Sequence, residues 1–204
     1  GAGNGEMMKV LVNTFDKFPI FKNSCRIKIL EKSKLLKKKQ KVNINKKNIK
    51  WLKNLTELDN LPCIFLANEF FDALPIKQFI KKEKKWFERH VKFFNKKFEY
   101  FDVPFDMEKF ENKIQFKIAK QQNFIEYSPQ STEYLKIVNN KIKRNNGGIL
   151  IIDYAYIDKK MKNTLQAVSK HKYCDVLKGF GDSDITYNLS FNLINSIVKE
   201  LSSL

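Results

Sequence analysis

The chain has 204 residues, of which 43% are hydrophobic and 30% are charged, and its formal net charge is +17 at pH 7. A chain of this length can bury the core of one domain, so we expect a single domain over residues 1–204. No apolar run approaches the roughly 18 residues that a membrane-spanning helix needs, and we therefore expect no membrane insertion.

The large positive charge raises the question of nucleic acid, because cations on a protein release counterions from phosphates. Only Arg26, Arg89 and Arg144 among the 39 basic residues are arginines, and the lysines are spread along the whole chain. Phosphate-binding surfaces favour arginine, whose planar guanidinium pairs with two oxygens at once. The charge therefore indicates a solvated lysine-rich surface, and we expect no specific nucleic-acid partner.

The cysteines and histidines predict no metal site. Cys25, Cys63 and Cys174 are far apart in the sequence without a C-x-x-C pair, and the only histidines are His90 and His171. This pattern is typical of free thiols in a reducing compartment. Chemistry in this protein must then come from carboxylates, amides and backbone groups.

In chain order, the glycine-rich stretch GAGNG at 1–5 precedes a predicted helix, which Pro19 is expected to end. CRIKILE at 25–31 alternates apolar and polar residues as a strand does. The following segment, SKLLKKKQ, predicts a short helix capped by Ser33. The first part of the chain is therefore predicted to run glycine loop, helix, strand, helix.

Two continuous apolar runs, CIFLAN at 63–68 and GGILIIDY at 147–154, are typical of strands buried on both faces of a parallel sheet. A lysine-rich helix is predicted across roughly 129–144. Strands that alternate with helices indicate an α/β doubly wound, Rossmann-like sheet.

The segment at about 76–118 has a different pattern. It alternates apolar and polar residues, and Asn95 followed by two lysines marks a hairpin turn, so we expect an antiparallel β insertion. The insertion could have a structural role, as a lid or buttress of the fold, or a functional role, as one wall of a substrate pocket. The pattern favours neither role. Short strands from residue 171 and a closing helix at about 191–201 complete the chain.

The glycine loop and the strand after it point to a nucleotide-like ligand. Gly1, Gly3 and Gly5 let the backbone approach a ligand without Cβ clashes, and the helix that follows offers amide donors. Glu31, at the end of the next strand, is placed to accept both ribose hydroxyls of a nucleoside cofactor. Alternatively, Glu31 only favours the dipole of the helix that follows it. These residues do not distinguish NAD from S-adenosylmethionine.

A second group of polar residues begins at the end of CIFLAN and continues after it. Ligands of open α/β sheets bind outside the carboxyl ends of the strands, where Asn68 and Glu69 are expected. Asn68 could instead cap a helix, but Pro75 would stop that helix within about two turns. Asp72 comes three residues after Glu69, and on one helical turn the two carboxylates would share a face.

Together, these segments resemble the MidA family of S-adenosylmethionine-dependent methyltransferases over essentially the whole chain. The resemblance rests on eight segments, in this order: GAGNGEMMKVL, KILEKSKLLKKKQ, IKWLKNL, LANEFFDALPIKQF, EYSP, GGILIIDY, NTLQAVSKH and GDSDIT. It implies a class I methyltransferase sheet and S-adenosyl-L-methionine as cofactor. It also implies that, in the family, a further region with the first strand of the sheet comes before the part that matches residue 1. Because mitochondrial members of the family methylate arginine during assembly of respiratory complex I, the resemblance implies a protein substrate, which a complex I subunit would fit. It implies a mitochondrial matrix location in a eukaryote and a cytoplasmic one in a bacterium, and it leaves the oligomeric state open.

Residue by residue, the resemblance places the three loop glycines and Glu31 against the cofactor. It places Asn68 and Glu69 beside the transferred methyl group, and it assigns Asp153 and Tyr154 to substrate binding. The chain departs from the family where GAGNG replaces Gly-Pro-Gly-Arg-Gly and where Asp-Tyr-Ala replaces Asp-Tyr-Gly. The segment ITYNLSF also departs, with Asn188 and Ser190 where the family often has His and Asp.

The chemistry of arginine supports a catalytic carboxylate. A guanidinium is a poor nucleophile until a carboxylate localises its positive charge away from the attacking nitrogen. We expect Glu69 to do this, with Asp72 as its partner or orienter and Asn68 holding the cofactor or substrate. Two alternatives are a methyltransferase of another substrate class and a non-catalytic assembly factor on the same fold.

Overall fold

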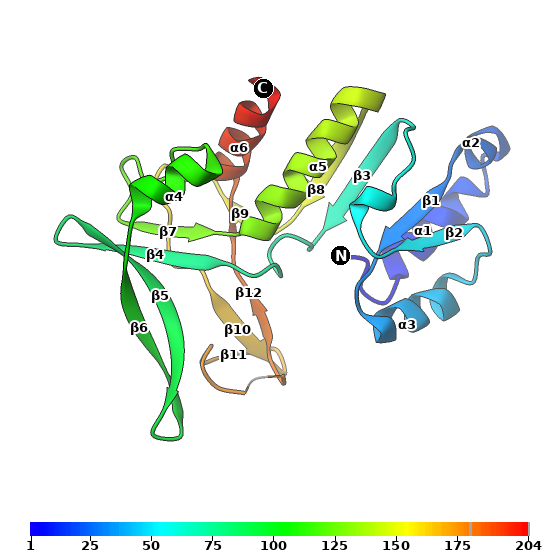
Figure 1. Ribbon diagram of the computed structural model, residues 1–204. Coiled ribbons are helices and arrows are strands. Elements are labelled where there is room, and N and C mark those ends of the chain that lie inside the picture. The colour runs from blue at the N-terminus through cyan, green and yellow to red at the C-terminus, as the bar shows by residue number, and fades with distance from the viewer. Residues whose placement is uncertain (180, 204) are drawn as a thin grey trace. The chain divides into compact units, whose positions relative to one another are not determined.

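The computed structural model describes residues 1–179 and 181–203. These residues form two compact units. Unit 1 contains residues 1–70 and 141–151, and unit 2 contains residues 71–140 and 152–204. Figure 1 labels the helices and strands of both units.

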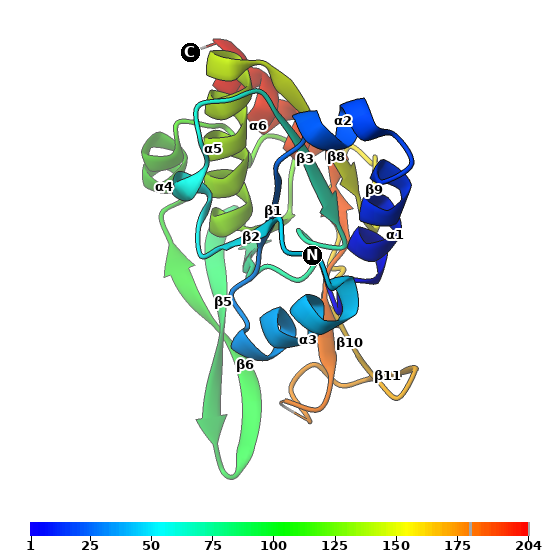
Figure 2. The same cartoon turned by 90° about the vertical axis from the view of Figure 1, so that its right-hand side faces the viewer.

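Unit 1 is built from short helices and strands. Its elements are α1 (Glu6–Phe15), α2 (Pro19–Ser24), β1 (Ile27–Leu30), α3 (Lys34–Ile44), β2 (Ile49–Leu52), the 3₁₀ turn η1 (Leu55–Glu57), β3 (Cys63–Asn68) and most of β8 (Gly147–Ile152). Strands β1 and β2 pair in parallel, and α1 and α3 pack against them (Figures 1 and 2). The core of this packing is a buried cluster of Val12, Ile29, Ile44 and Ile49.

The predicted helix α3 has the expected cap, because the Ser33 hydroxyl accepts a hydrogen bond from Leu36 N at 3.2 Å. The prediction for Pro19 was wrong. Helix α1 ends at Phe15, and Pro19 lies in the first turn of a second helix, α2. Proline fits that position because its fixed φ is helical and the missing N–H has no partner in a first turn.

Strands β3 and β8 form a two-stranded sheet of their own within the described residues. We expected both strands to be buried on both faces, and this was wrong: one face is exposed, and on the other face only Ala67 is fully buried. The side chain of Ile64 is 86% exposed, and Leu66 and Leu150 are also exposed. Ile64 and Leu66 alternate along β3 and therefore lie on the same face of the sheet, which is the face open to solvent.

Unit 2 contains the predicted antiparallel insertion. Its first elements are β4 (Lys77–Lys82), β5 (Lys85–Phe94), β6 (Lys97–Phe105), α4 (Met107–Ile114), β7 (Phe124–Tyr127) and α5 (Pro129–Asn145), whose last residues belong to unit 1. The strands form one antiparallel sheet in the order β6-β5-β4-β7. The β5–β6 turn lies at Asn95 and Lys96, both with positive φ, which confirms the predicted hairpin.

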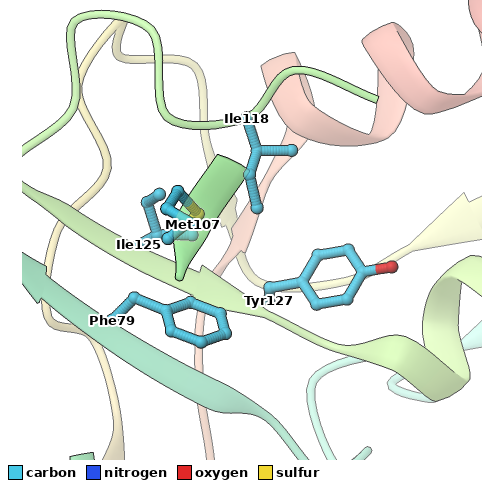
Figure 3. Close-up of a cluster of buried hydrophobic side chains, with 5 residues drawn as sticks. All are labelled: Phe79, Met107, Ile118, Ile125 and Tyr127. Carbon is cyan, nitrogen blue, oxygen red and sulfur yellow. The ribbon is translucent and has the colours of Figure 1, made fainter. Parts of the chain in front are cut away.

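The core of unit 2 lies where this sheet meets α4 and the loop after it. Phe79, Met107, Ile118, Ile125 and Tyr127 form a buried cluster (Figure 3). The rings of Phe79 and Phe105 are 4.5 Å apart between centroids. Complete burial of a side chain such as Phe79 contributes roughly 1.5–3 kcal/mol, so this cluster anchors the inner end of the insertion.

The remainder of unit 2 consists of short strands and a closing helix, as expected. These elements are β9 (Ala155–Tyr156), β10 (Gln166–Ser169), β11 (Lys172–Cys174), β12 (Asp184–Thr186), β13 (Leu189–Ser190) and α6 (Phe191–Ser203). β10 pairs antiparallel with both β11 and β12, and β13 pairs in parallel with β9. Among the described residues, no helix is both long and apolar enough to cross a bilayer.

Candidate functional site

The glycine loop of unit 1 turns sharply into α1. Gly5 is the N-cap residue of α1 and has a φ of 92°, a left-handed conformation that side chains disfavour. A Cβ at Gly5 would lie 3.1 Å from the Ile44 side chain of α3, which would have to shift by a few tenths of an ångström to admit it. Apart from its neighbours in the chain, no heavy atom of the described residues lies within 4 Å of the position that a Cβ of Gly3 would take, which leaves room beside the loop.

The loop lies at the carboxyl end of β3. The terminal amino group of Gly1 donates hydrogen bonds to the carbonyl of Asn68 and, at 2.9 Å, to the carbonyl of Glu69. Unit 1 therefore brings together the first loop glycine with Asn68 and Glu69 at the end of β3, which are 67 and 68 positions away in the sequence.

Glu31 lies just after β1 and is half-buried. One carboxylate oxygen accepts a hydrogen bond from Ser33 N at 2.8 Å, and the other accepts one from Gln40 Nε2 at 2.8 Å. The bond to Ser33, the cap of α3, shows that Glu31 also interacts with the helix that follows it. Each carboxylate oxygen has capacity for a second hydrogen bond, so both can still accept a ligand hydroxyl.

Gln40 also belongs to the candidate site, although no sequence motif indicated it. Its buried side-chain nitrogen donates to Glu31 and, at 2.9 Å, to the carbonyl of Gly3, while its oxygen accepts from Trp51 Nε1 at 2.9 Å. One amide thus joins the glycine loop, the acidic residue and β2. The only sequence signal is a single neutral amide within the lysine-rich run KKKQK.

The segment after β3 is not a helix. Residues 69–74 form bends and turns, so Asn68 does not cap a helix, and the helical face that Glu69 and Asp72 could have shared is absent from this segment. Glu69 is exposed and has a φ of 43°, which is uncommon for a residue with a side chain. Such a conformation costs roughly 1–3 kcal/mol and is often found at functional sites.

In unit 2, the Asp153 carboxylate holds the turn that follows Phe70. One of its oxygens accepts hydrogen bonds from Phe71 N at 3.0 Å and Asp72 N at 3.3 Å, and the other accepts from Tyr154 N at 2.9 Å. Asp72 is buried, and its carbonyl accepts from Tyr187 N at 3.1 Å. In contrast, Tyr154 is 65% exposed.

Glu126 of the EYSP segment was not selected from the sequence, although the structure buries it. Its carboxylate accepts hydrogen bonds from Gln78 Nε2 at 2.9 Å, Thr164 N at 3.1 Å, Leu165 N at 3.2 Å and the Thr164 hydroxyl. The EYSP and NTLQ segments are therefore joined by one buried network. This network explains both segments as parts of the fold of unit 2.

The cavity beside Glu126 is small. It has a volume of about 30 Å³ and is lined in part by Ser128, Tyr187 and Asn188. Burial raises the pKa of the Tyr187 hydroxyl to about 12, so this group stays protonated at neutral pH. The volume suits ordered water rather than a substrate.

The two tail residues that depart from the family pattern have structural contacts. Asn188 N donates to the Thr164 hydroxyl at 3.0 Å, and the Ser190 hydroxyl accepts from Leu193 N at 3.3 Å in the first turn of α6. Neither contact requires His or Asp, so the departures are compatible with the observed fold.

The profile of a family described as putative S-adenosyl-L-methionine-dependent methyltransferase matches residues 1–204. The chain belongs to this family. A likely methyl transferase from Burkholderia thailandensis, crystallised with S-adenosyl-homocysteine, has a similar fold: the TM-score is 0.77 at 18% identity, over 98% of this chain and 54% of that chain. This similarity confirms the predicted α/β methyltransferase fold.

Curated relatives carry a more specific name. A Caenorhabditis elegans protein named as a homolog of the mitochondrial protein arginine methyltransferase NDUFAF7 is 29% identical over 160 residues, which are 75% of this chain and 37% of that protein. The Xenopus tropicalis protein arginine methyltransferase NDUFAF7 is 24% identical over all of this chain and 53% of its own length. The chain thus spans about a third to a half of these relatives.

Proposed function

We propose that this protein is an S-adenosylmethionine-dependent methyltransferase that methylates arginine in a protein substrate. The observation that carries the proposal is that unit 1 joins the glycine loop, Glu31 and the end of β3 through Gly1 and Gln40. The names of the curated relatives support arginine as the acceptor. The ligand of the Burkholderia thailandensis protein supports the cofactor.

The residues of unit 1 fit this cofactor. The open space at Gly3 admits a ligand against the loop backbone, and the half-buried Glu31 carboxylate keeps acceptor capacity for ribose hydroxyls. When bound, S-adenosylmethionine supplies an electrophilic methyl group. We expect Gly1, Gly3, Gly5 and Glu31 to hold it.

In the proposed mechanism, the exposed Glu69 carboxylate binds the substrate guanidinium. Its charge holds the positive charge of the guanidinium away from the attacking nitrogen, and its oxygen receives the released proton. The Asn68 amide orients the bound groups. Holding the reacting atoms about 3–3.5 Å apart can account for roughly 7–11 kcal/mol of the barrier reduction.

Asp72, Asp153 and Tyr154 have different roles in this proposal. Asp72 is buried, which favours a role in orienting the turn over direct proton transfer. Asp153 bonds the backbone of the same turn, so it positions that turn, while the exposed Tyr154 ring is free to contact substrate. We further propose a respiratory complex I subunit as acceptor, in the mitochondrial matrix of a eukaryote, or a cytoplasmic acceptor in a bacterium.

Calorimetric titration tests the cofactor. We expect S-adenosylmethionine, but not NAD, to bind the purified protein. Glu31→Ala should weaken this binding about 10- to 100-fold, because the two charge-assisted hydrogen bonds from the ribose hydroxyls to the carboxylate are lost. Glu57→Ala is the matched control, since Glu57 also accepts backbone hydrogen bonds in unit 1 but lies in η1. Binding of NAD, or equal effects of the two substitutions, would refute the assignment.

Gln40→Leu tests the link between the loop and Glu31. Without the amide, Trp51 Nε1 loses its acceptor, so the free energy of unfolding should fall by about 1–3 kcal/mol. The glycine loop also loses a hydrogen bond, so S-adenosylmethionine binding should be roughly tenfold weaker. Gln122→Leu is the matched control, because Gln122 is a buried amide of unit 2 that bonds Lys159 O and Met161 N. Urea unfolding should show comparable losses for both variants. If Gln122→Leu weakens S-adenosylmethionine binding as much as Gln40→Leu does, Gln40 has no specific positioning role.

A further inference from the structure

The outer part of the β5–β6 hairpin carries exposed aromatic side chains. Every residue from Val91 to Tyr100 is exposed, including Phe93 at 64%, Phe94 at 53% and Phe98 at 41%. β4 pairs with β5 only as far as Arg89, so the hairpin continues beyond that point as a two-stranded ribbon. Figure 1 shows its turn far from α4 and β7, and Figure 2 shows it far from α4.

The aromatic side chains of this ribbon tip, residues 91–100, lie on both of its faces. Phe93 is opposite Phe98 across the two strands, with ring centroids 4.9 Å apart, and Val91 is opposite Tyr100 on the same face. Phe94 is the neighbour of Phe93 along the strand and therefore points to the other face. A two-stranded ribbon has no core in which to bury such side chains.

The tip is also cationic. Lys92, Lys96 and Lys97 surround the phenylalanines, and Glu99, opposite Lys92, is the acidic residue among positions 91–100. Lys92 Nζ lies 5.1 Å from the centroid of the Phe94 ring, a cation–π distance, so a lysine ammonium lies directly beside an exposed aromatic ring. Aromatic rings framed by lysines match the boundary between acyl chains and anionic headgroups.

We propose that the ribbon tip attaches the protein to the surface of an anionic lipid bilayer. A protein partner on one face of the ribbon would leave the phenylalanine on the other face in water, whereas a lipid interface surrounds the tip on all sides. Lys96 lies in the turn and Lys97 directly follows it, so their ammonium groups are at the apex of the ribbon. They would meet the anionic headgroups, with the phenylalanine rings beside them at the interface. The tip does not span the bilayer, and its free strand edges keep contact with headgroups and water.

The attachment is independent of the methyltransferase proposal, because none of the tip residues belongs to the cofactor or catalytic groups. Binding to phosphatidylcholine vesicles with and without phosphatidylserine tests it by flotation. We expect binding only with phosphatidylserine, weaker binding at high salt, and at least tenfold weaker binding for the Phe93→Ser/Phe94→Ser double variant. Phe18→Ser is the matched control, since Phe18 is an exposed phenylalanine of unit 1 and its loss should not change vesicle binding.

A second variant separates charge from apolar contact. Lys92→Gln/Lys96→Gln/Lys97→Gln should remove the preference for phosphatidylserine. Unchanged urea unfolding and unchanged S-adenosylmethionine titration are expected in all tip variants. Absence of vesicle binding by the unaltered protein, or equal binding by the phenylalanine double variant, would overturn the proposal. So would a dimer, seen by light scattering, that the phenylalanine substitutions dissociate without any lipid binding, since the tip would then be a self-association surface.

Discussion

Replacing Gly147 with alanine is expected to break the pairing of β8 with β3. Gly147 has a φ of 135°, and a Cβ there would lie 1.9 Å from the carbonyl oxygen of Cys63 and 2.8 Å from its carbonyl carbon. These neighbours are backbone atoms, so no side chain can rotate to make space. Overpacking and the disfavoured φ together should lower the free energy of unfolding by about 2–5 kcal/mol.

Urea unfolding of Gly147→Ala against Gly148→Ala measures this effect. At the next residue, Gly148, φ is not positive, and no heavy atom of the part of the chain that the structure describes, apart from its chain neighbours, lies within 4 Å of the position of a Cβ. Alanine there should therefore change stability by less than about 1 kcal/mol. Because β3 carries Asn68 and leads into Glu69, Gly147→Ala should also weaken cofactor binding. Equal midpoints for the two variants would show that the β3–β8 pairing does not require glycine at position 147.

Glu69→Gln is expected to abolish methyl transfer while leaving cofactor binding intact. The amide keeps the size of the side chain but can neither balance a guanidinium charge nor take its proton, so we expect a rate about 100- to 10,000-fold lower. Transfer of labelled methyl groups to proteins of a cell extract measures the rate, and calorimetry measures binding. Glu83→Gln is the matched control, because Glu83 is also an exposed glutamate with a positive φ of 47°.

Glu69→Gly separates catalysis from stability at the same position. Glycine tolerates the observed φ of 43° better than glutamate, so this variant should be at least as stable as the unaltered protein and yet inactive. A Glu69→Gln variant with full transfer activity would refute the catalytic role. Absence of transfer by the unaltered protein, with partner binding retained, would favour the non-catalytic assembly factor.

The sequence alone determined most of the elements and their types. The Ser33 cap and the turn at Asn95 depend on contacts within a few residues, so the local pattern of residue types predicts them directly. The predicted strands at CIFLAN and GGILII and the helix after EYSP have the same basis. The order of elements then indicated the α/β class, which the structural similarity confirmed.

Only the tertiary structure decided how the site residues are held. Gln40 bonds the carbonyl of Gly3, 37 positions away, and Asp153 bonds Phe71 N, 82 positions away. The left-handed backbone of Glu69 and the exposed face of β3 likewise follow from distant neighbours rather than from local pattern. Hydrogen bonds and burial between remote segments arise only after the chain has folded, and one sequence carries no periodic signal for them.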